Sequence, residues 1–161
     1  MKYEPQLHVV LYQPEIPQNT GNIGRSCVAA AAKLWLVKPL GFRLDEKNLR
    51  RAGLDYWQYL EWEVVNDWNE LTKKLPTDNH WYFSKWGKKS YVQAEYALGD
   101  VLVFGSESAG LPGKIWNDEP DRTVRIPIRD EVRSLNLGSA AAVAIFESLR
   151  QLETKNLIQR H

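Results

Sequence analysis

Short apolar runs that alternate with helix-like segments constrain the fold of this chain more than any other feature of its sequence. The runs at 7–12, 34–37 and 101–104 consist almost entirely of apolar residues, as in strands buried on both faces. Helical patterns or helix-capping signals occur at 21–33, 67–75 and 135–152. Because strands that alternate with helices pack as a parallel sheet covered by helices, the sequence predicts an α/β fold.

Shorter elements complete this predicted pattern. We expect strands at 81–83 and 124–126, and a short helix from Pro112 to Trp116 with proline in its first turn. The segment 45–52 begins with acids and ends with arginines, which suits a helix dipole. The carboxyl-terminal segment 153–161 is expected to fray. A chain of 161 residues has the size of one domain.

Composition limits the class of protein. The 21 basic and 20 acidic residues nearly balance, which argues against a general phosphate-coating protein and permits a local basic patch. A single cysteine, Cys27, excludes an intrachain disulfide and a cysteine metal cluster, and it fits a reducing compartment. The start of the chain lacks the apolar core of a signal peptide, and no apolar run approaches the ~20 residues that cross a bilayer. We therefore expect a cytoplasmic protein with no membrane association.

Three segments with polar and glycine residues follow predicted strands: 19–25, 105–110 and 126–136. In an open parallel sheet the carboxyl ends of the strands meet at one edge, where ligands bind. The sequence therefore predicts a pocket with one positively charged functional residue, Arg25, which we expect to be buried. Taken alone, Arg25 fits a salt bridge on a helix face equally well, and Glu107 fits an ordinary loop carboxylate.

Other motifs favour ordinary structural roles. Asn19-x-Gly21-x-x-Gly24 is close to the dinucleotide fingerprint, but it lies six residues after its strand instead of following it at once. Ser106 and Ser108 are not centred in Gly-x-Ser-x-Gly, so a serine hydrolase is disfavoured. The histidines show no ligand spacing, and we predict no metal site.

The three segments, read together, carry a family resemblance. Asn19-Thr-Gly with Arg25, Gly105-Ser-Glu-Ser-Ala-Gly, and Ile126-Pro with Ser134-Leu-Asn resemble, in order and spacing, the SPOUT superfamily of RNA methyltransferases. The segments 14–23 and 39–56 are similar to those of minimal, single-domain 2'-O-ribose methyltransferases of the tRNA wobble nucleotide.

The resemblance implies one α/β domain over 1–161, with a trefoil knot over roughly 80–152, an exception to the rule against threaded chains. It also implies methyl transfer from S-adenosylmethionine to the ribose 2'-hydroxyl of the wobble nucleotide, position 34, cytidine or uridine, of tRNA.

The resemblance further assigns roles to individual residues. Its catalytic set matches Arg25, Asn19 and Glu107, and its cofactor-binding set matches Phe83, Gly105, Ile126, Ser134, Leu135 and Asn136. Because the pKa of an arginine lies above ~12, we expect Arg25 to steer a phosphate and stabilise the developing alkoxide. Action of Arg25 as a general base is the alternative.

The implied partners are a tRNA anticodon stem-loop and a second copy of the chain, with no DNA. The RNA would run across the dimer seam. Seven tryptophans exceed the needs of the core, and the surplus would fill the interface or, alternatively, stack on unpaired bases. Phosphate contacts would come from Arg43, Lys47, Arg50, Arg51, Lys85, Lys88 and Lys89.

Ala109 and Gly138 depart from the residues that are common in relatives, which leaves the nucleotide preference open. Two alternative functions also stay open: methylation of another tRNA or rRNA site, and an RNA-binding module without chemistry.

Overall fold

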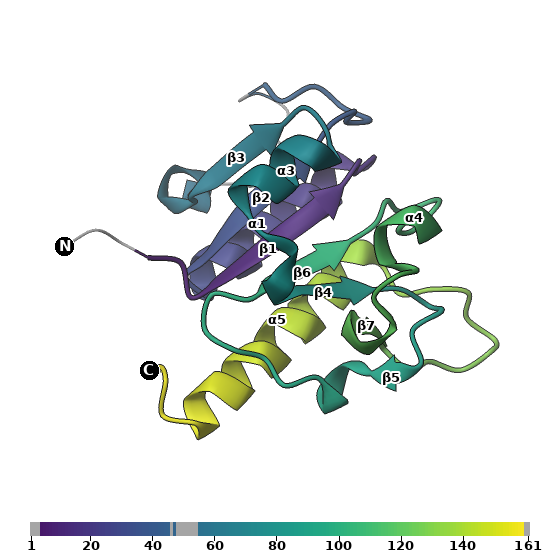
Figure 1. Cartoon of the computed structure of the whole chain (residues 1–161). Helices are drawn as coiled ribbons and strands as arrows, with labels where there is room; N and C mark the ends of the chain where they lie inside the picture. The colour runs from purple at the N-terminus through teal and green to yellow at the C-terminus, as the bar shows by residue number, and fades with distance from the viewer. Residues whose placement is uncertain (1–3, 46, 48–54, 160–161) are drawn as a thin grey trace.

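The computed structural model describes residues 4–45, 47 and 55–159, which form a parallel sheet between two layers of helices (Figure 1). The strands are β1 (Leu7–Tyr12), β2 (Ala32–Val37), β3 (Trp62–Val65), β4 (His80–Phe83), β5 (Lys89–Ser90), β6 (Val101–Phe104) and β7 (Thr123–Arg125). They pair in the order β3-β2-β1-β6-β4-β7-β5, and each pair is parallel. The α/β prediction is confirmed.

Helices cover both faces of this sheet. The described helices are α1 (Pro17–Ala29), α3 (Trp68–Lys74), α4 (Gly113–Trp116) and α5 (Leu137–Thr154). Short 3-10 helices are η1 (Asp55–Tyr59), η2 (Thr77–Asn79), η3 (Tyr91–Gln93) and η4 (Pro120–Arg122). α1 and α5 pack side by side behind the sheet in Figure 1, whereas α3 and α4 lie in front of it.

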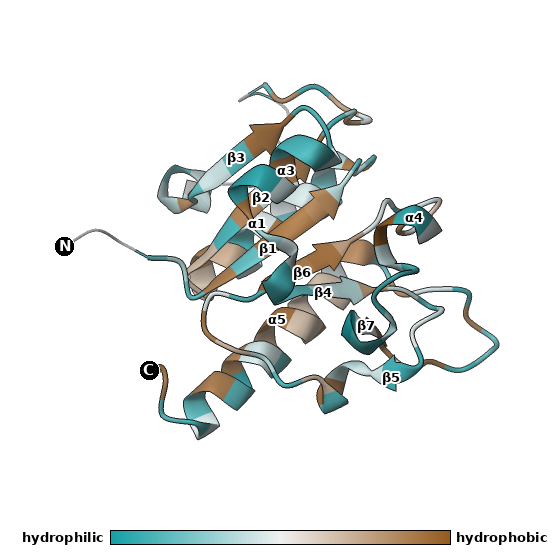
Figure 2. Cartoon of the chain, in the orientation of Figure 1, coloured by the Kyte–Doolittle hydropathy of each residue, from teal (hydrophilic) through white to brown (hydrophobic). Residues whose placement is uncertain are grey.

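The alternation of side chains along β1 explains the two cores. Val9 and Leu11 point to the α1/α5 layer, where they join Ile145 of α5 in one buried cluster. Val10 points to the opposite face and belongs to the other cluster, with Leu71 of α3. Because both faces are covered, β6 and most of β1 are hydrophobic (brown in Figure 2), which is why their sequences contain long apolar runs.

Several predicted boundaries shift for local reasons. The helix predicted at 21–33 begins at Pro17, because proline is accepted in a first helical turn, and it ends at Ala29. Ala31 has a φ of 52°, which breaks the helix before β2. The helix predicted at 67–75 is confirmed: the Asp67 side chain accepts a hydrogen bond from the Glu70 N–H at 2.8 Å and caps α3.

The prediction of a frayed segment at 153–161 is wrong over its described part. α5 continues through Thr154, and Ile158 is buried. Lys155 Nζ donates a hydrogen bond to the Tyr96 carbonyl at 3.0 Å, which ties the end of the helix to the body. The helix predicted at 45–52 lies mostly outside the described residues. In the part of the chain that is described, no helix has the length and apolarity to cross a membrane.

One buried histidine makes stability depend on pH. His80 is fully buried, its Nε2 donates to the Leu75 carbonyl at 3.0 Å in the neutral tautomer, and its Nδ1 lies 3.4 Å from the Tyr82 hydroxyl. Burial lowers the pKa of His80 to about 4. Its usual value is 6.5, so protons bind the unfolded chain more strongly between these two pH values.

We expect the contribution of neutral His80 to be complete above pH 6.5 and to be lost as the pH falls to about 4. Between pH 7 and 4, the free energy of unfolding of the wild type should fall by up to roughly 3 kcal/mol more than that of His80→Gln. Glutamine does not titrate but still offers an amide donor. Urea titrations across this pH range measure the difference, and parallel curves would contradict it.

Candidate functional site

The loops that follow β1, β4, β6 and β7 line one open cleft of about 980 Å³ at the carboxyl ends of the strands. Its volume is at the upper end of the range for small-molecule sites. Phe83 and Phe104, the last residues of β4 and β6, lie in its wall as a stacked pair with ring centroids 4.6 Å apart. The cleft therefore combines an apolar wall with polar loops, as a ligand site requires.

The structure brings together all but one of the residues that the sequence assigned to the site. The cleft is lined by Asn19, Phe83, Gly105, Glu107, Ile126, Ser134, Leu135 and Asn136. Arg25 is missing from this lining. The convergence of distant segments is thus confirmed, while the cofactor-binding and catalytic roles of these residues stay predictions.

The Glu107 carboxylate joins the loop after β6 to the loop before α1. Its Oε1 accepts the Glu15 N–H at 2.9 Å, and its Oε2 accepts the Ile16 N–H at 2.6 Å and the Asn19 Nδ2 amide at 3.3 Å. The bonded groups lie at the start of α1, where unsatisfied backbone N–H groups and the helix dipole favour a negative charge. Glu107 therefore acts as a cap supplied from 92 residues away.

Two side-chain amides extend this connection to the third loop. Asn136 Nδ2 donates to Asn19 Oδ1 at 3.0 Å, and Asn136 Oδ1 accepts the Ser139 N–H at 3.2 Å, which caps α5. The same Asn19 donates to Glu107. Glu107, Asn19 and Asn136 thus form a continuous hydrogen-bonded chain across all three loops, so each of them positions the cleft.

Sequence reasoning missed a second carboxylate, Glu15. Its Oε1 accepts the Ser108 N–H at 3.2 Å and the Ser108 hydroxyl, and the hydrogen bonds from Ser108 lower the pKa of the Glu15 carboxyl. The two segments are therefore connected in both directions. The Glu15 side chain binds Ser108, and the side chain of the neighbouring Glu107 binds the Glu15 backbone. Glu15 lies in the segment 14–23 that carries the family resemblance, but its role was missed because only the folded chain brings it to Ser108.

Glycine is required where the loop after β6 closes on itself. A Cβ atom on Gly105 would lie 2.0 Å from the Gly110 carbonyl carbon, which no side chain tolerates. Gly110 has a φ of +69° and donates its N–H to the Ser106 carbonyl at 2.9 Å. These two glycines explain the tight Gly-x-Glu-x-x-Gly turn that presents Glu107 to α1.

The expectation that Arg25 is buried in the cleft is wrong. Arg25 is exposed, and its guanidinium carbon lies 4.9 Å from the centroid of the Tyr56 ring. It follows Asn19 by six residues, which places it about 9 Å farther along α1 and about 120° around the helix. Within one chain, α1 therefore places Asn19 in the cleft and Arg25 outside it.

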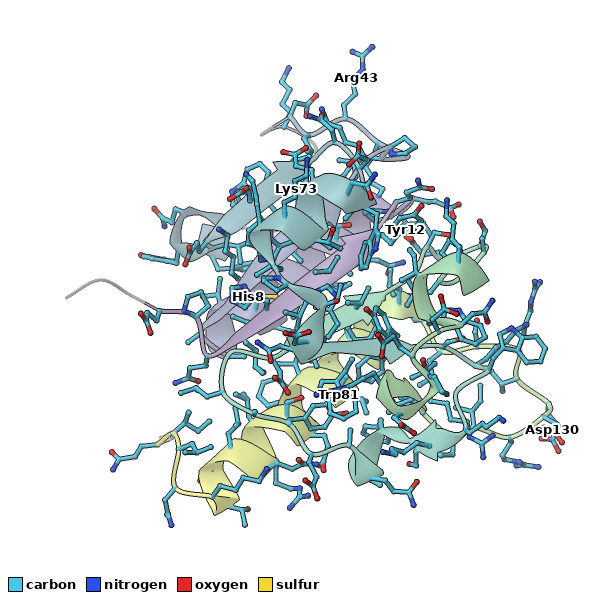
Figure 3. The ribbon with its side chains drawn as sticks, in the orientation of Figure 1. His8, Tyr12, Arg43, Lys73, Trp81 and Asp130 are labelled. Carbon is cyan, nitrogen blue, oxygen red and sulfur yellow. The ribbon has the colours of Figure 1, made fainter. Side chains whose placement is uncertain are left out.

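The predicted surface contacts stay predictions. Of the seven tryptophans, Trp35 and Trp81 are buried, Trp62 and Trp86 are exposed and the other three are half-buried, so the exposed pair is the main candidate for the interface or stacking role. Lys85 and Lys88 are exposed after β4, whereas Arg43 lies far across the molecule from Asp130 on the cleft loop (Figure 3). Arg50 and Arg51 lie outside the described residues.

Metal ligands do not gather in the described ranges, 4–45, 47 and 55–159: no group of three His, Cys, Asp or Glu side chains there could hold an ion. His8 accepts the Trp35 indole N–H at 3.0 Å, and burial lowers the pKa of His8 to about 4. This histidine is therefore a neutral part of the packing against Trp35.

Fold and site together define an α/β protein with an open parallel sheet, whose ligand cleft is built from three motif-bearing loops at the strand ends. Residues 6–146 match the SpoU rRNA Methylase family. The chain belongs to this family.

Named relatives and solved structures are similar over nearly the whole chain. The tRNA (cytidine(34)-2'-O)-methyltransferase of Methylovorus glucosotrophus is 44% identical over 144 residues, which cover 89% of this chain and 94% of that protein. A structure solved for insights into the 2-OH methylation of C/U34 on tRNA is 44% identical with a TM-score of 0.86, covering 92% of this chain and 97% of that one. An AdoMet-bound rRNA methyltransferase from Sinorhizobium meliloti is 25% identical with a TM-score of 0.79, covering 94% and 62%.

The loop connection through Glu107 can be tested directly. Glu107→Gln keeps the shape but removes the charge and turns one acceptor into a donor, so we expect the free energy of unfolding to fall by about 1.5–3 kcal/mol. Amide hydrogen exchange at Glu15 and Ile16 should accelerate with it. Glu131→Gln, which alters an exposed pair with Arg129, should change stability by less than about 0.5 kcal/mol. Unchanged exchange at the two amides in Glu107→Gln would contradict the connection.

Proposed function

We propose that this protein transfers a methyl group from S-adenosylmethionine to the ribose 2'-hydroxyl of nucleotide 34, cytidine or uridine, of tRNA. The observation that carries the proposal is the convergence of three motif loops into one cleft, in a chain that spans nearly the full length of relatives named for this reaction. The AdoMet-bound structure of a more distant relative supports the choice of cofactor.

The cleft residues fit this cofactor. An apolar wall suits an adenine ring, and backbone groups of the loops at 105–110 and 126–136 suit its polar edge. Phe83, Gly105, Ile126, Ser134, Leu135 and Asn136 would hold it, and when bound it supplies an electrophilic methyl group on a sulfonium. The part of the protein itself is to hold the donor and the ribose oxygen in line and to stabilise the charge that develops on that oxygen.

Arg25 enters this chemistry through a second copy of the chain. On α1, Gln18, Asn22, Arg25 and Ala29 form an exposed stripe, and Val143 and Phe146 are exposed on the adjacent α5, at 38% and 42%. Apolar side chains on a packed helix pair favour a partner surface. A homodimer through α1 and α5 would cover them and bring the exposed Arg25 of each chain toward a phosphate of the bound RNA.

The remaining parts of the proposal concern the fold and its setting. Residues 1–161 form one domain, and the chain from roughly 80 to 152 is knotted, with α5 held beneath the segment after β5. Gln151 of α5 contacts this segment, donating to the Ala94 carbonyl at 2.9 Å and accepting the Tyr96 N–H at 3.0 Å. A reducing cytoplasm fits the buried thiol of Cys27 and the tRNA substrate.

A second candidate function is 2'-O-methylation of another RNA site, which the rRNA description of the family favours. Nucleoside mass spectrometry of tRNA and rRNA from a deletion strain separates the two. The proposal requires loss of the ribose methyl at nucleotide 34 of tRNA and its return on complementation. Loss from rRNA alone supports the second candidate, and no loss from either RNA would overturn both.

Arg25→Ala tests the predicted electrostatic role. Removal of a group that stabilises developing charge should lower the turnover number roughly 100- to 1000-fold. The affinity for S-adenosylmethionine should stay unchanged, because Arg25 does not line the cleft of its own chain. Methyl-transfer assays and calorimetry measure the two quantities, with Lys73→Ala on α3 as the control. Near-normal turnover of Arg25→Ala would refute the assignment.

Phe146→Glu tests the dimer. A buried charge in the proposed interface should shift the protein from dimer to monomer in sedimentation experiments and reduce methyl transfer at least tenfold. Leu157→Glu, at an apolar side chain 49% exposed beyond the end of α5, is the matched control and should remain dimeric. A wild type that sediments as a monomer at micromolar concentration would contradict the proposed assembly.

A further inference from the structure

Trp86 is the most exposed tryptophan of the described residues, and it lies at the cleft. The residue is 66% exposed and belongs to the cleft lining, in the turn that follows β4. Tryptophan side chains are usually well buried, because their large apolar area is costly to leave in water. The other exposed tryptophan, Trp62, contacts Trp57 with ring centroids 5.3 Å apart.

The backbone around Trp86 is fixed. The Ser84 hydroxyl accepts the Trp86 N–H at 3.2 Å, and the Ser84 carbonyl accepts the Gly87 N–H at 3.0 Å. Ser84 in turn donates its own N–H to the Val124 carbonyl of β7 at 3.0 Å. Gly87 packs so closely on this strand that a Cβ atom would lie 2.6 Å from the Val124 carbonyl carbon. The indole is therefore presented to solvent from an ordered turn.

Basic residues outnumber acidic residues in the lining of the same cleft. The ionisable lining residues are Lys85, Arg125, Arg129 and Arg133 against Glu107 and Asp130, and Glu107 is already engaged at the start of α1. Arg129 pairs with Glu131 at 2.9 Å. Lys85 Nζ lies 4.9 Å from the centroid of the Trp86 ring. An exposed aromatic ring with Lys85 beside it, in a cleft lined by more basic than acidic residues, matches a ligand that carries both a flat ring and negative charge.

We propose, on the basis of the proposed function, that Trp86 is a stacking site for an unpaired base of the RNA loop, with Lys85 placed to contact an adjacent phosphate. Proteins recognise single-stranded RNA by stacking splayed bases on aromatic rings within a positively charged surface. An unpaired nucleobase joined to phosphates fits both features. The adenine of the cofactor or a second copy of the chain would use the ring but not the excess of basic residues in the cleft lining.

RNA binding tests the site without depending on methyl transfer. Trp86→Ala should weaken the binding of an anticodon stem-loop RNA roughly 10- to 100-fold, and Trp86→Phe should restore most of the loss. Tyr59→Ala, at an aromatic residue 73% exposed outside the cleft lining, is the matched control and should bind like the wild type. Fluorescence anisotropy of labelled RNA at fixed salt measures all four proteins, and thermal unfolding confirms that each variant is folded.

A double-mutant cycle that combines a protein substitution with an RNA change identifies the stacked base. RNAs with an abasic nucleotide at successive positions of the loop are bound to the wild type and to Trp86→Ala. At the stacked position, removal of the base should weaken the wild type but leave Trp86→Ala nearly unchanged, because the two changes remove the same contact. At other positions the two effects should multiply.

Three results would overturn the inference: unchanged RNA affinity in Trp86→Ala, an equal loss of affinity for S-adenosylmethionine, or dissociation of the dimer. The second result assigns the ring to the cofactor, and the third assigns it to an interface. Failure of the proposed function has a different signature. A wild type that binds the stem-loop through Trp86 but transfers no methyl group refutes the proposed reaction and leaves the stacking site standing.

Discussion

The site depends on the hydrogen bonds that the Glu107 carboxylate accepts from the start of α1. The carboxylate accepts two backbone N–H groups and one amide from the start of α1, although it lies on a loop after β6. Neither β1 nor β6 alone could form the cleft, because the loops after four different strands line it. A charge-assisted connection between them fixes where α1 begins, and Asn19 passes that placement to Asn136 and so to α5.

The strand runs and the three loops could be predicted because their signals are local. Val101–Phe104 is apolar without interruption and forms a central strand, and Asp67 stands where an N-cap belongs. β3 escaped prediction because Trp62 and Glu63 lie at the edge of the sheet, where polar and apolar residues are mixed. The order of the strands could not be read from sequence, since β6 pairs with β1 across roughly ninety residues.

In the candidate site, too, features with a local sequence signal could be predicted, whereas features that depend on the folded chain could not. Glycine spacing, Glu107 and Asn136 mark the loops, and their convergence follows from the rule for parallel sheets. Glu15 and the exposure of Trp86 carry no such signal, because both depend on which chain segments face each other after folding. The position of Arg25 could have been anticipated from helical periodicity once the start of α1 was known, but Pro17 begins that helix four residues earlier than the pattern indicated.

The separation of Arg25 from the cleft has a mechanistic consequence. A single chain builds a complete ligand cleft and leaves its predicted catalytic cation on the outside of α1, against Tyr56. In the proposed homodimer, cofactor binding would require one folded chain, whereas methyl transfer would also require a bound RNA and Arg25 of the second chain. Such an arrangement would keep the bound sulfonium away from a charged catalyst until the correct RNA is seated. Assembly and substrate binding, more than the cleft itself, would then determine when the methyl group is transferred.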